Sequence, residues 1–459
     1  MEKESQSIDP VPFWKRKRYL IALLTFFGFF NVYTLRVNLS VAIVSMTEIR
    51  NVTLTDGTII QEQDFDWDSK QRGVVLSAFF YGYITTQFIG GYLSLKYGGN
   101  VIFGCGIGVT ALLTLLTPYA ASVSIYALVA VRVIEGVFEG MTFPACFHVW
   151  SKWAPPMERS RIMGFNMAGL YVGTVVGMPF SGILASTLGW QSIFYVFGGI
   201  GVVWFILWLL IVRKSPADDP RLSTAERNYI MSSLGDEPNK LTEVNVPWMK
   251  IFTSGSVWAI IIAHFCEAWG FFTMFTQLPS FLKDMLSFDL TSSALLSGVP
   301  YLALSICVCC SGYLADWFQM KGILSTRNVR RIFCCGSFAV QACLMILVAF
   351  VIDKFYSVLI LTFAVGAGAF SLSGYAVNHL DIAPTYASII WGISNTLGSV
   401  PGIVSPLLTG YIVTTPTEAE WQIIFYITAG FYLFGSIVYW FLCSGTLRPW
   451  AKQEPIELY

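Results

Sequence analysis

Three charged residues stand close together inside an apolar stretch of the chain: Arg132, Glu135 and Glu139. Their spacing of i, i+3 and i+7 places them in one narrow stripe if the stretch is an α-helix. A charged group near the centre of a bilayer costs on the order of 2.5–3.5 kcal/mol on insertion scales, so three together are costly. One arginine faces two carboxylates, which leaves one acid unpaired and points to transport. The alternative is a neutral ion pair that only joins one helix to another.

A further arginine, Arg36, lies well inside the first long apolar run. A guanidinium there can hold a carboxylate or a phosphate through two parallel hydrogen bonds, which suits the binding of an anion. Its alternative role is that of a structural partner for the two glutamates. Glu139 can carry a proton if an arginine alternately approaches and leaves it, because its proton affinity then changes during the cycle.

The composition excludes most classes of soluble protein. Of the 459 residues, 55% are hydrophobic and only 12% are charged. Apolar runs of membrane-spanning length recur along almost the whole chain, which is more than one signal peptide could explain. The formal net charge of zero argues against a nucleic-acid partner. We expect an all-α polytopic protein embedded in a lipid bilayer.

Neither an enzyme nor a metal site is predicted. The sequence contains no nucleophile–base constellation, phosphate-binding loop or metal motif. The ten cysteines lie in or beside apolar segments and lack the spacing of a zinc site, so they are expected to be packing residues.

Twelve membrane-spanning helices are expected from the apolar runs. Their ranges are 19–47, 70–96, 100–118, 123–150, 160–187, 190–213, 252–283, 290–317, 329–351, 354–382, 384–414 and 420–445. They divide the chain into an N-terminal tail (1–18), a six-helix bundle (19–213), a linker (214–250), a second six-helix bundle (251–445) and a C-terminal tail (446–459).

The distribution of charges predicts the orientation in the membrane. Lysines and arginines gather on the side of the N-terminus and acids gather on the other side, so both tails and the linker are expected to be cytosolic. Asn51-Val52-Thr53, in the loop after the first span, is a glycosylation acceptor that agrees with a lumenal or extracellular position. Asn38-Leu39-Ser40 fits the same pattern but lies inside a span, where no glycan is expected.

The two bundles repeat one another in sequence. Three motif pairs recur in the same order: Gly91-Tyr-Leu with Gly312-Tyr-Leu, Gly173 and Gly177 with Gly398 and Gly402, and Trp190-Gln-Ser-Ile-Phe-Tyr with Trp421-Gln-Ile-Ile-Phe-Tyr. Parallel six-span repeats around a central site are the architecture of secondary transporters of the major facilitator type. The counterpart of the 132–139 stretch, at 361–368, carries no charge, which places the proton-binding groups in the first half only.

Several motifs, spread over almost the whole chain, resemble one family of that superfamily. They are Leu35-Arg36-Val-Asn38-Leu-Ser-Val-Ala, Phe79-Phe80-Tyr81-Gly82-Tyr83-Ile84, Glu139-Gly-Met-Thr-Phe-Pro144, Trp153-Ala-Pro-Pro156-Met-Glu-Arg-Ser160 and Asn378-His-Leu-Asp-Ile-Ala-Pro384. The family is the anion/cation symporter family of sialin, the vesicular glutamate transporters and the type I sodium–phosphate cotransporters. Within it, the chain is most similar to sialin.

The resemblance implies a substrate site around Arg36. This arginine would contact the anionic group of the substrate, with Tyr33 one turn earlier and Tyr81 across the cavity. Glu267 departs from the family, because glutamate transporters have an arginine at its position and sialin has a tyrosine. If Glu267 faces the cavity, it would discourage a dianionic substrate or recruit a cation.

The resemblance also implies a proton site and a gate. Glu139 would bind the coupling proton, while Glu135 and Arg132 complete its polar cluster and help to gate it. Asp316 ends the second copy of the superfamily's cytosolic loop motif, Gly312-Tyr-Leu-Ala-Asp316, and is interpreted as a gating residue or, alternatively, as a helix-end charge. Two histidines are accessory candidates or, alternatively, satisfied core residues: His264 and His379.

Together these features predict a proton-coupled symporter of a small organic anion, either a sugar acid or an acidic amino acid, that works by alternating access. The coupling ion is expected to be H⁺, with Na⁺ as the alternative, and no cofactor is expected. The second hypothesis is a sodium-coupled cotransporter of inorganic phosphate, and a third is a non-transporting sensor on a transporter fold. We expect a monomer in the plasma membrane or an endolysosomal membrane.

Overall fold

The computed structural model describes residues 16–53, 59–234, 246–351, 353–383 and 386–451. Within these ranges, nine helical segments are long and apolar enough to cross a membrane. They are α1 (Lys17–Met46), α3 (Gly99–Val123), α6 (Pro156–Leu188), α7 (Gln191–Ile211), α10 (Gly255–Leu286), α11 (Leu290–Met320), α12 (Thr326–Val348), α13 (Lys354–Ser371) with its continuation through η2 (Leu372–Ala376) and α14 (Val377–Ile382), and α17 (Glu418–Leu442).

Three further spans complete the expected twelve. The first is α2 (Ser69–Tyr97), which carries polar residues along its length. The second is α4 (Ile125–Glu139) followed by α5 (Thr142–Trp153), and the third is α15 (Ala387–Gly398) followed by α16 (Val400–Ile412). The twelve-span all-α fold is thereby confirmed, and the largest boundary difference is in the third span, expected to end at 118 and found to end at Val123.

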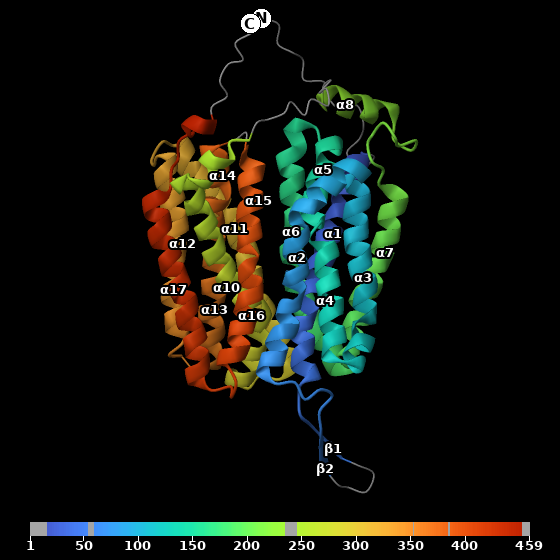
Figure 1. Cartoon of the computed structure of the whole chain (residues 1–459), viewed down its shortest axis with the longest axis vertical. Coiled ribbons are helices and arrows are strands. Elements are labelled where there is room, and N and C mark those ends of the chain that lie inside the picture. The colour runs from blue at the N-terminus through green and yellow to red at the C-terminus, as the bar shows by residue number, and fades with distance from the viewer. Residues whose placement is uncertain (1–15, 54–58, 235–245, 352, 384–385, 452–459) are drawn as a thin grey trace, which may run out of the picture.

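Several short elements outside the spans were not expected. An antiparallel hairpin of β1 (Arg50–Thr53) and β2 (Ile59–Glu62) follows the first span, and α8 (Thr224–Leu234) and α9 (Trp248–Phe252) lie between the two bundles in sequence. Figure 1 shows the hairpin and α8 at opposite ends of the molecule, which we call the hairpin end and the linker end. Asn51 lies on β1, outside the spans, whereas Asn38 is buried within α1, as the two acceptor motifs predicted.

Helix α8 is fastened to the start of α1. The carboxylate of Glu226 accepts hydrogen bonds from the backbone N–H groups of Lys17, at 2.8 Å, and Arg18, at 3.2 Å, and it pairs with the Arg18 guanidinium at 3.2 Å. The Lys17 ammonium also pairs with Asp219. These groups satisfy backbone donors that a helix N-terminus leaves unpaired, so α8 is held to the first bundle.

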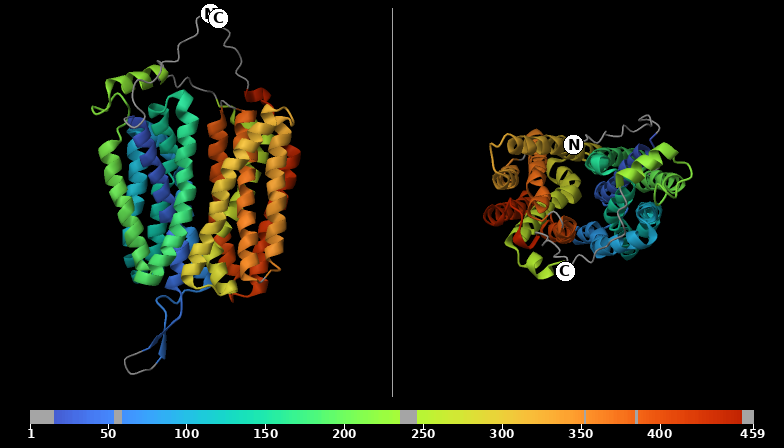
Figure 2. Two further views of the ribbon diagram at one scale, coloured as in Figure 1. Left: turned by 180° about the vertical axis from the view of Figure 1, so that it is seen from behind. Right: turned by 90° about the horizontal axis from the view of Figure 1, so that it is seen from above.

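The two bundles lie side by side and converge at the hairpin end (Figures 1 and 2). The contacts between them include the Lys283 Nζ–Glu48 Oε1 ion pair at 2.7 Å, the close approach of Gly73 to the carbonyl of Pro406, and the Asn395 Nδ2–Gln87 Oε1 hydrogen bond at 2.7 Å. The described hydrogen bonds and ion pairs between the bundles extend no nearer to the linker end than Asn395 and Gln87. This arrangement is that of a two-bundle transporter closed on one side.

Two glycines allow α2 and α4 to pack in direct backbone contact. A Cβ atom at Gly82 would lie 1.9 Å from the carbonyl oxygen of Val133, and one at Gly136 would lie 1.9 Å from that of Phe79. Real Cβ atoms do not approach an oxygen so closely, so only glycine permits this packing. The contact sets the position of the polar stripe on α4 relative to α2.

We predict that Gly136→Ala separates α2 from α4 and destabilises the protein by about 1–3 kcal/mol, the usual cost of overpacking. Gly199→Ala is the matched control, because nothing lies within 4 Å of a Cβ at that position of α7. Thermal unfolding of the purified variants in detergent measures the effect. Equal melting temperatures for the two variants would contradict the packing described.

We predict that Asn51 carries an N-linked glycan when the protein is made in a eukaryotic cell. Asn51→Gln should abolish the shift in electrophoretic mobility that a glycosidase produces, because Asn38 is buried in α1 and unavailable. Thr53→Ser, which preserves the acceptor motif, should retain the shift. If the glycosidase-sensitive shift persists in Asn51→Gln, the glycan is attached to another residue and the prediction is wrong.

Candidate anion and proton site

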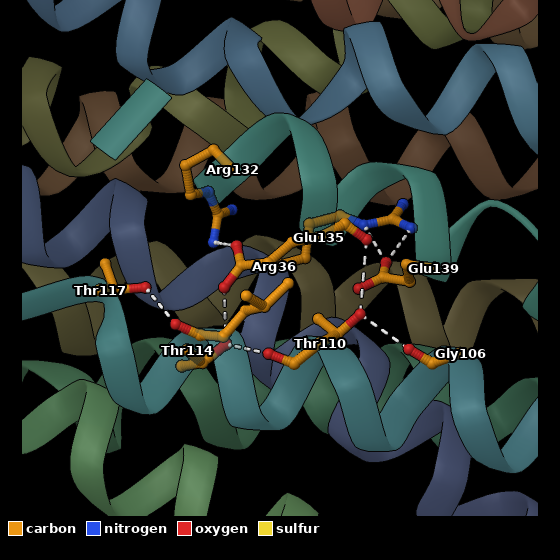
Figure 3. Close-up of polar contacts among 9 residues, drawn as sticks. Arg36, Gly106, Thr110, Thr114, Thr117, Arg132, Glu135 and Glu139 are labelled. Atoms are coloured by element: carbon orange, nitrogen blue, oxygen red, sulfur yellow. Dashed lines mark hydrogen bonds and ion pairs between the residues drawn. The ribbon is translucent and has the colours of Figure 1, made fainter. Parts of the chain in front are cut away.

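The first element of the site is an ion pair between the first and fourth spans. Arg36 of α1 donates a hydrogen bond from Nε to Oε1 of Glu139 at 2.9 Å, and its Nη2 donates to the same oxygen. Arg36 is only 6% exposed and Glu139 is fully buried. Figure 3 shows the two side chains meeting at the end of α4. A charged pair this deep in the protein is rare unless it has a function.

A second ion pair lies one helical turn away. Arg132 Nη1 lies 2.6 Å from Glu135 Oε2, and Thr114 of α3 donates a hydrogen bond to Glu135 Oε1 at 3.0 Å (Figure 3). Both oxygens of Glu135 are therefore satisfied. The expectation that two acids share one guanidinium was wrong, because Arg36 reaches across from α1 and supplies the second cation.

Two buried polar atoms in this cluster have no hydrogen-bond partner among the described residues: Glu139 Oε2 and Arg132 Nε. Both hydrogen bonds from Arg36 go to the other oxygen of Glu139, so Oε2 is available to accept a proton. A buried polar atom without a hydrogen-bond partner normally lowers stability, so the unpartnered Oε2 of Glu139 is an indication of function. The sequence predicted one glutamate without a cation; the structure instead pairs both glutamates and leaves one oxygen, Glu139 Oε2, without a partner.

Three aromatic rings surround the Arg36 guanidinium. Its Cζ atom lies 4.9 Å from the ring centroid of Tyr33, 4.8 Å from that of Phe79 and 4.7 Å from that of Tyr83. Cation–π contacts at these distances are favourable, particularly away from water. The guanidinium is therefore bounded by aromatic carbon on several sides and by the Glu139 carboxylate on another.

Tyr33 therefore lies where it was predicted, but Tyr81 does not. Residues 79 and 83 are four apart and share one face of α2, whereas residue 81 lies on the opposite face. There Tyr81 is 40% exposed, in line with the exposed Val74. Tyr83 takes the expected place, and the i, i+4 spacing of two aromatics in the second span was the signal that could have identified it.

The remaining predicted residues form separate clusters in the second bundle. His264 of α10 shares a hydrogen bond with Ser394 at 2.8 Å, and its ring lies between Tyr375 and Trp391, each at 5.2 Å. His379 lies 5.5 Å from the same Trp391, and its Nδ1 has no described partner. The structure does not bring these histidines to Arg36.

Glu267 also lies apart from Arg36. Its Oε2 accepts a hydrogen bond from Gln341 Nε2 at 3.0 Å, and Gln341 in turn donates to Ser337 at 3.1 Å. The side chain of Asp316 lies outside the described residues, so its predicted role stays a prediction. Among the residues that the structure describes, no group of three or more histidines, cysteines and acids could hold a metal ion.

Comparisons with known proteins agree on the class of molecule. Residues 21–406 match the model of the Major Facilitator Superfamily. The chain is 40% identical to vesicular glutamate transporter 1 of Xenopus laevis over 456 residues, which is 99% of this chain and 79% of that protein. It is 40% identical to vesicular glutamate transporter 2 of Homo sapiens over 458 residues, which is 99% of this chain and 78% of that protein.

Solved structures share the fold at low sequence identity. The crystal structure of a D-xylose–proton symporter is similar with a TM-score of 0.71 and 13% identity, over 93% of this chain and 98% of that one. A bacterial homologue of the human lysosomal transporter Spinster, in an inward-facing and unoccupied conformation, is similar with a TM-score of 0.70 and 13% identity, again over 93% and 98% of the two chains.

The Arg36–Glu139 pair should dominate the stability of the first bundle. Arg36→Met leaves a buried carboxylate without its cation and is expected to cost about 3–5 kcal/mol. Adding Glu139→Gln to Arg36→Met should recover part of that loss, because the buried charge is removed. Denaturation of the purified variants, treated as a double-mutant cycle, measures the coupling between the two residues.

The matched control is the Lys283–Glu48 pair, whose side chains are 24% and 31% exposed. A partly exposed pair couples weakly, by about 1 kcal/mol or less. A coupling between Arg36 and Glu139 no larger than that of the control pair would contradict the assignment of a buried, structure-determining ion pair.

Proposed function

Because the chain belongs to the Major Facilitator Superfamily, and within it to the family of the vesicular glutamate transporters, we propose that it is a proton-coupled symporter of a small organic anion. It is a multi-pass membrane transporter and not an enzyme. The single observation that supports proton coupling most directly is the Arg36–Glu139 ion pair with its unpartnered Oε2.

The proposed coupling is a competition for one guanidinium. Arg36 carries a single positive charge and cannot neutralise the carboxylate of Glu139 and that of an incoming anion equally well; two of its five N–H donors, on Nε and Nη2, already bind Glu139. A proton that binds Glu139 Oε2 removes the negative charge and releases Arg36, which then binds the anion. One proton and one monovalent anion together carry no net charge, so the loaded site is as neutral as the empty one.

Electrostatics explains why the two ligands need each other. An anion that bound beside ionised Glu139 would place two negative charges around one cation in a medium of low dielectric constant. A proton that bound without an anion would leave Arg36 buried and unpaired. Either half-loaded state is costly, so alternating access of the bundles favours the empty and fully loaded states. The Arg132–Glu135 pair, one helical turn away on α4, is part of the same polar cluster.

The surroundings of Arg36 favour an organic anion over inorganic phosphate. Three aromatic rings contact the guanidinium and offer apolar surface for a carbon skeleton, which phosphate lacks. A sugar acid and an acidic amino acid both combine a carboxylate with such a skeleton. The names of the relatives, which are vesicular glutamate transporters, support the inclusion of glutamate and the choice of an endomembrane over the plasma membrane.

The test uses the full-length protein reconstituted into liposomes. An imposed pH gradient without sodium should drive accumulation of labelled L-glutamate or D-glucuronate inside the more alkaline compartment. If a pH gradient drives uptake of none of these compounds (L-glutamate, D-glucuronate or labelled phosphate), proton-coupled transport is overturned. Uptake of phosphate that requires sodium at fixed pH would instead favour the sodium–phosphate hypothesis.

We predict that Glu139→Gln abolishes uptake driven by the pH gradient but preserves the exchange of internal for external anion. Glutamine mimics the protonated acid, so Arg36 stays available and the proton is no longer needed. Glu420→Gln is the matched control, because this partly exposed acid in the first turn of α17 belongs to neither ion pair of the site, and the variant should transport normally. Loss of anion exchange together with gradient-driven uptake in Glu139→Gln would contradict the role assigned to Glu139.

A further inference from the structure

Glu267 is an acid of the membrane interior that the mechanism above does not use. It is the thirteenth residue of the 32-residue helix α10 and follows Gly255 by 267 − 255 = 12 residues, which is about 18 Å along the helix axis. Glu135 and Glu139 are fully buried and each is paired with an arginine. Glu267, in contrast, is partly exposed and has no cation within ion-pair distance among the described residues.

The groups that surround Glu267 are polar but uncharged. Gln341 donates to its Oε2 at 3.0 Å from α12, and Ser371 faces it from the end of α13. The nearby titratable groups are thiols and phenols from five different elements: Cys266 of α10, Cys334 of α12, Tyr375 of η2, Tyr432 of α17 and Tyr171 of α6. The described ion pairs include none for Glu267, and the hydrogen bond described for the His264 imidazole is to Ser394.

The other carboxylate oxygen of Glu267, Oε1, lies in a confined space beside Gly368. A Cβ atom at Gly368 of α13 would lie 2.5 Å from Glu267 Oε1 and 3.2 Å from Gln341 Oε1. The glycine therefore leaves room for the carboxyl group beside an amide oxygen, which can only accept a hydrogen bond. A protonated Glu267 could donate to such an acceptor, whereas an ionised one could not.

We propose that Glu267 is a second proton-binding site, located in the second bundle, which loads and releases a proton in each transport cycle. The proposal rests on the proton-coupled function inferred above and extends it, since the coupling groups are then no longer confined to the first bundle. Glu267 differs from Glu135 and Glu139 because it is partly exposed and has no cation among the described residues, so its carboxyl group can gain and lose a proton without breaking an ion pair. The neighbouring Tyr171 belongs to the first bundle, so rocking of the bundles changes what covers Glu267.

The first test measures the number of protons carried with each anion. Full-length protein in liposomes containing a pH-sensitive dye is given labelled L-glutamate or D-glucuronate, and proton and anion fluxes are recorded together. Glu267→Gln should lower the proton-to-anion ratio by one, whereas Glu267→Asp and the control Glu420→Gln should keep the wild-type ratio. The proposal is overturned if Glu267→Gln keeps the wild-type proton-to-anion ratio. It is also overturned if the wild type requires sodium for transport and Glu267→Gln does not.

The second test does not depend on transport. Infrared difference spectra of the purified protein, recorded as a function of pH, detect the carbonyl stretch of each carboxylic acid that gains a proton. The wild type should show a component that Glu267→Gln lacks and that Glu139→Gln and Glu420→Gln retain. Spectra of Glu267→Gln that match the wild type would sink the proposal even if the variant does not transport.

The two tests separate the failure of this inference from the failure of the proposed function. If the wild type moves no anion in response to a pH gradient, the symport function fails, while the infrared spectra still report whether Glu267 binds a proton. If the wild type is a symporter and Glu267→Gln keeps both its ratio and its spectrum, only the second proton site fails.

Discussion

The buried ion pair between Arg36 and Glu139 is the interaction on which the rest of the first bundle depends. A guanidinium and a carboxylate inside a bilayer each carry a desolvation cost that only close contact offsets. The surrounding structure supplies that contact: paired glycines let α2 and α4 approach, and the aromatic rings of α1 and α2 cover the guanidinium. Removing either charge leaves the other buried and unpaired, which lowers the stability of the protein. The proposed coupling uses this same dependence of one charge on the other.

Much of the fold could be predicted because bilayer thickness imposes a length on each apolar run. The stripe of Arg132, Glu135 and Glu139 was predictable because helical periodicity operates over a few residues. The Arg36–Glu139 contact could be raised only as an alternative role for Arg36, since it joins residues 103 apart in sequence and depends on how the helices pack. Tyr81 was wrongly placed for a related reason, because a motif identifies a helix but not which of its faces points inward. The hairpin and α8 were missed because they are short and polar.

The two bundles share a fold but divide the chemistry unequally. The first contains two ion pairs deep in its interior, Arg36–Glu139 and Arg132–Glu135, and Thr114 completes the hydrogen bonding of the Glu135 carboxylate. The second contains the Arg330–Asp381 ion pair at 2.7 Å, a separate carboxylate, Glu267, that is held by an amide, and an aromatic cluster around two histidines. A repeated fold therefore does not imply repeated function, because helix packing constrains small and apolar residues while the polar positions remain free to diverge.

The unequal use of the two oxygens of Glu139 has a kinetic consequence. Under the proposed coupling, a proton reaches Oε2 while Arg36 still holds Oε1, and the anion competes with ionised Glu139 for Arg36 until that proton has bound. Binding is then ordered, with the proton first. In an ordered mechanism of this kind, acidification raises the apparent affinity for the anion and leaves the maximal rate unchanged. A single unpartnered oxygen would thereby let the acidity of a compartment set how much substrate the transporter needs to reach half of its maximal rate.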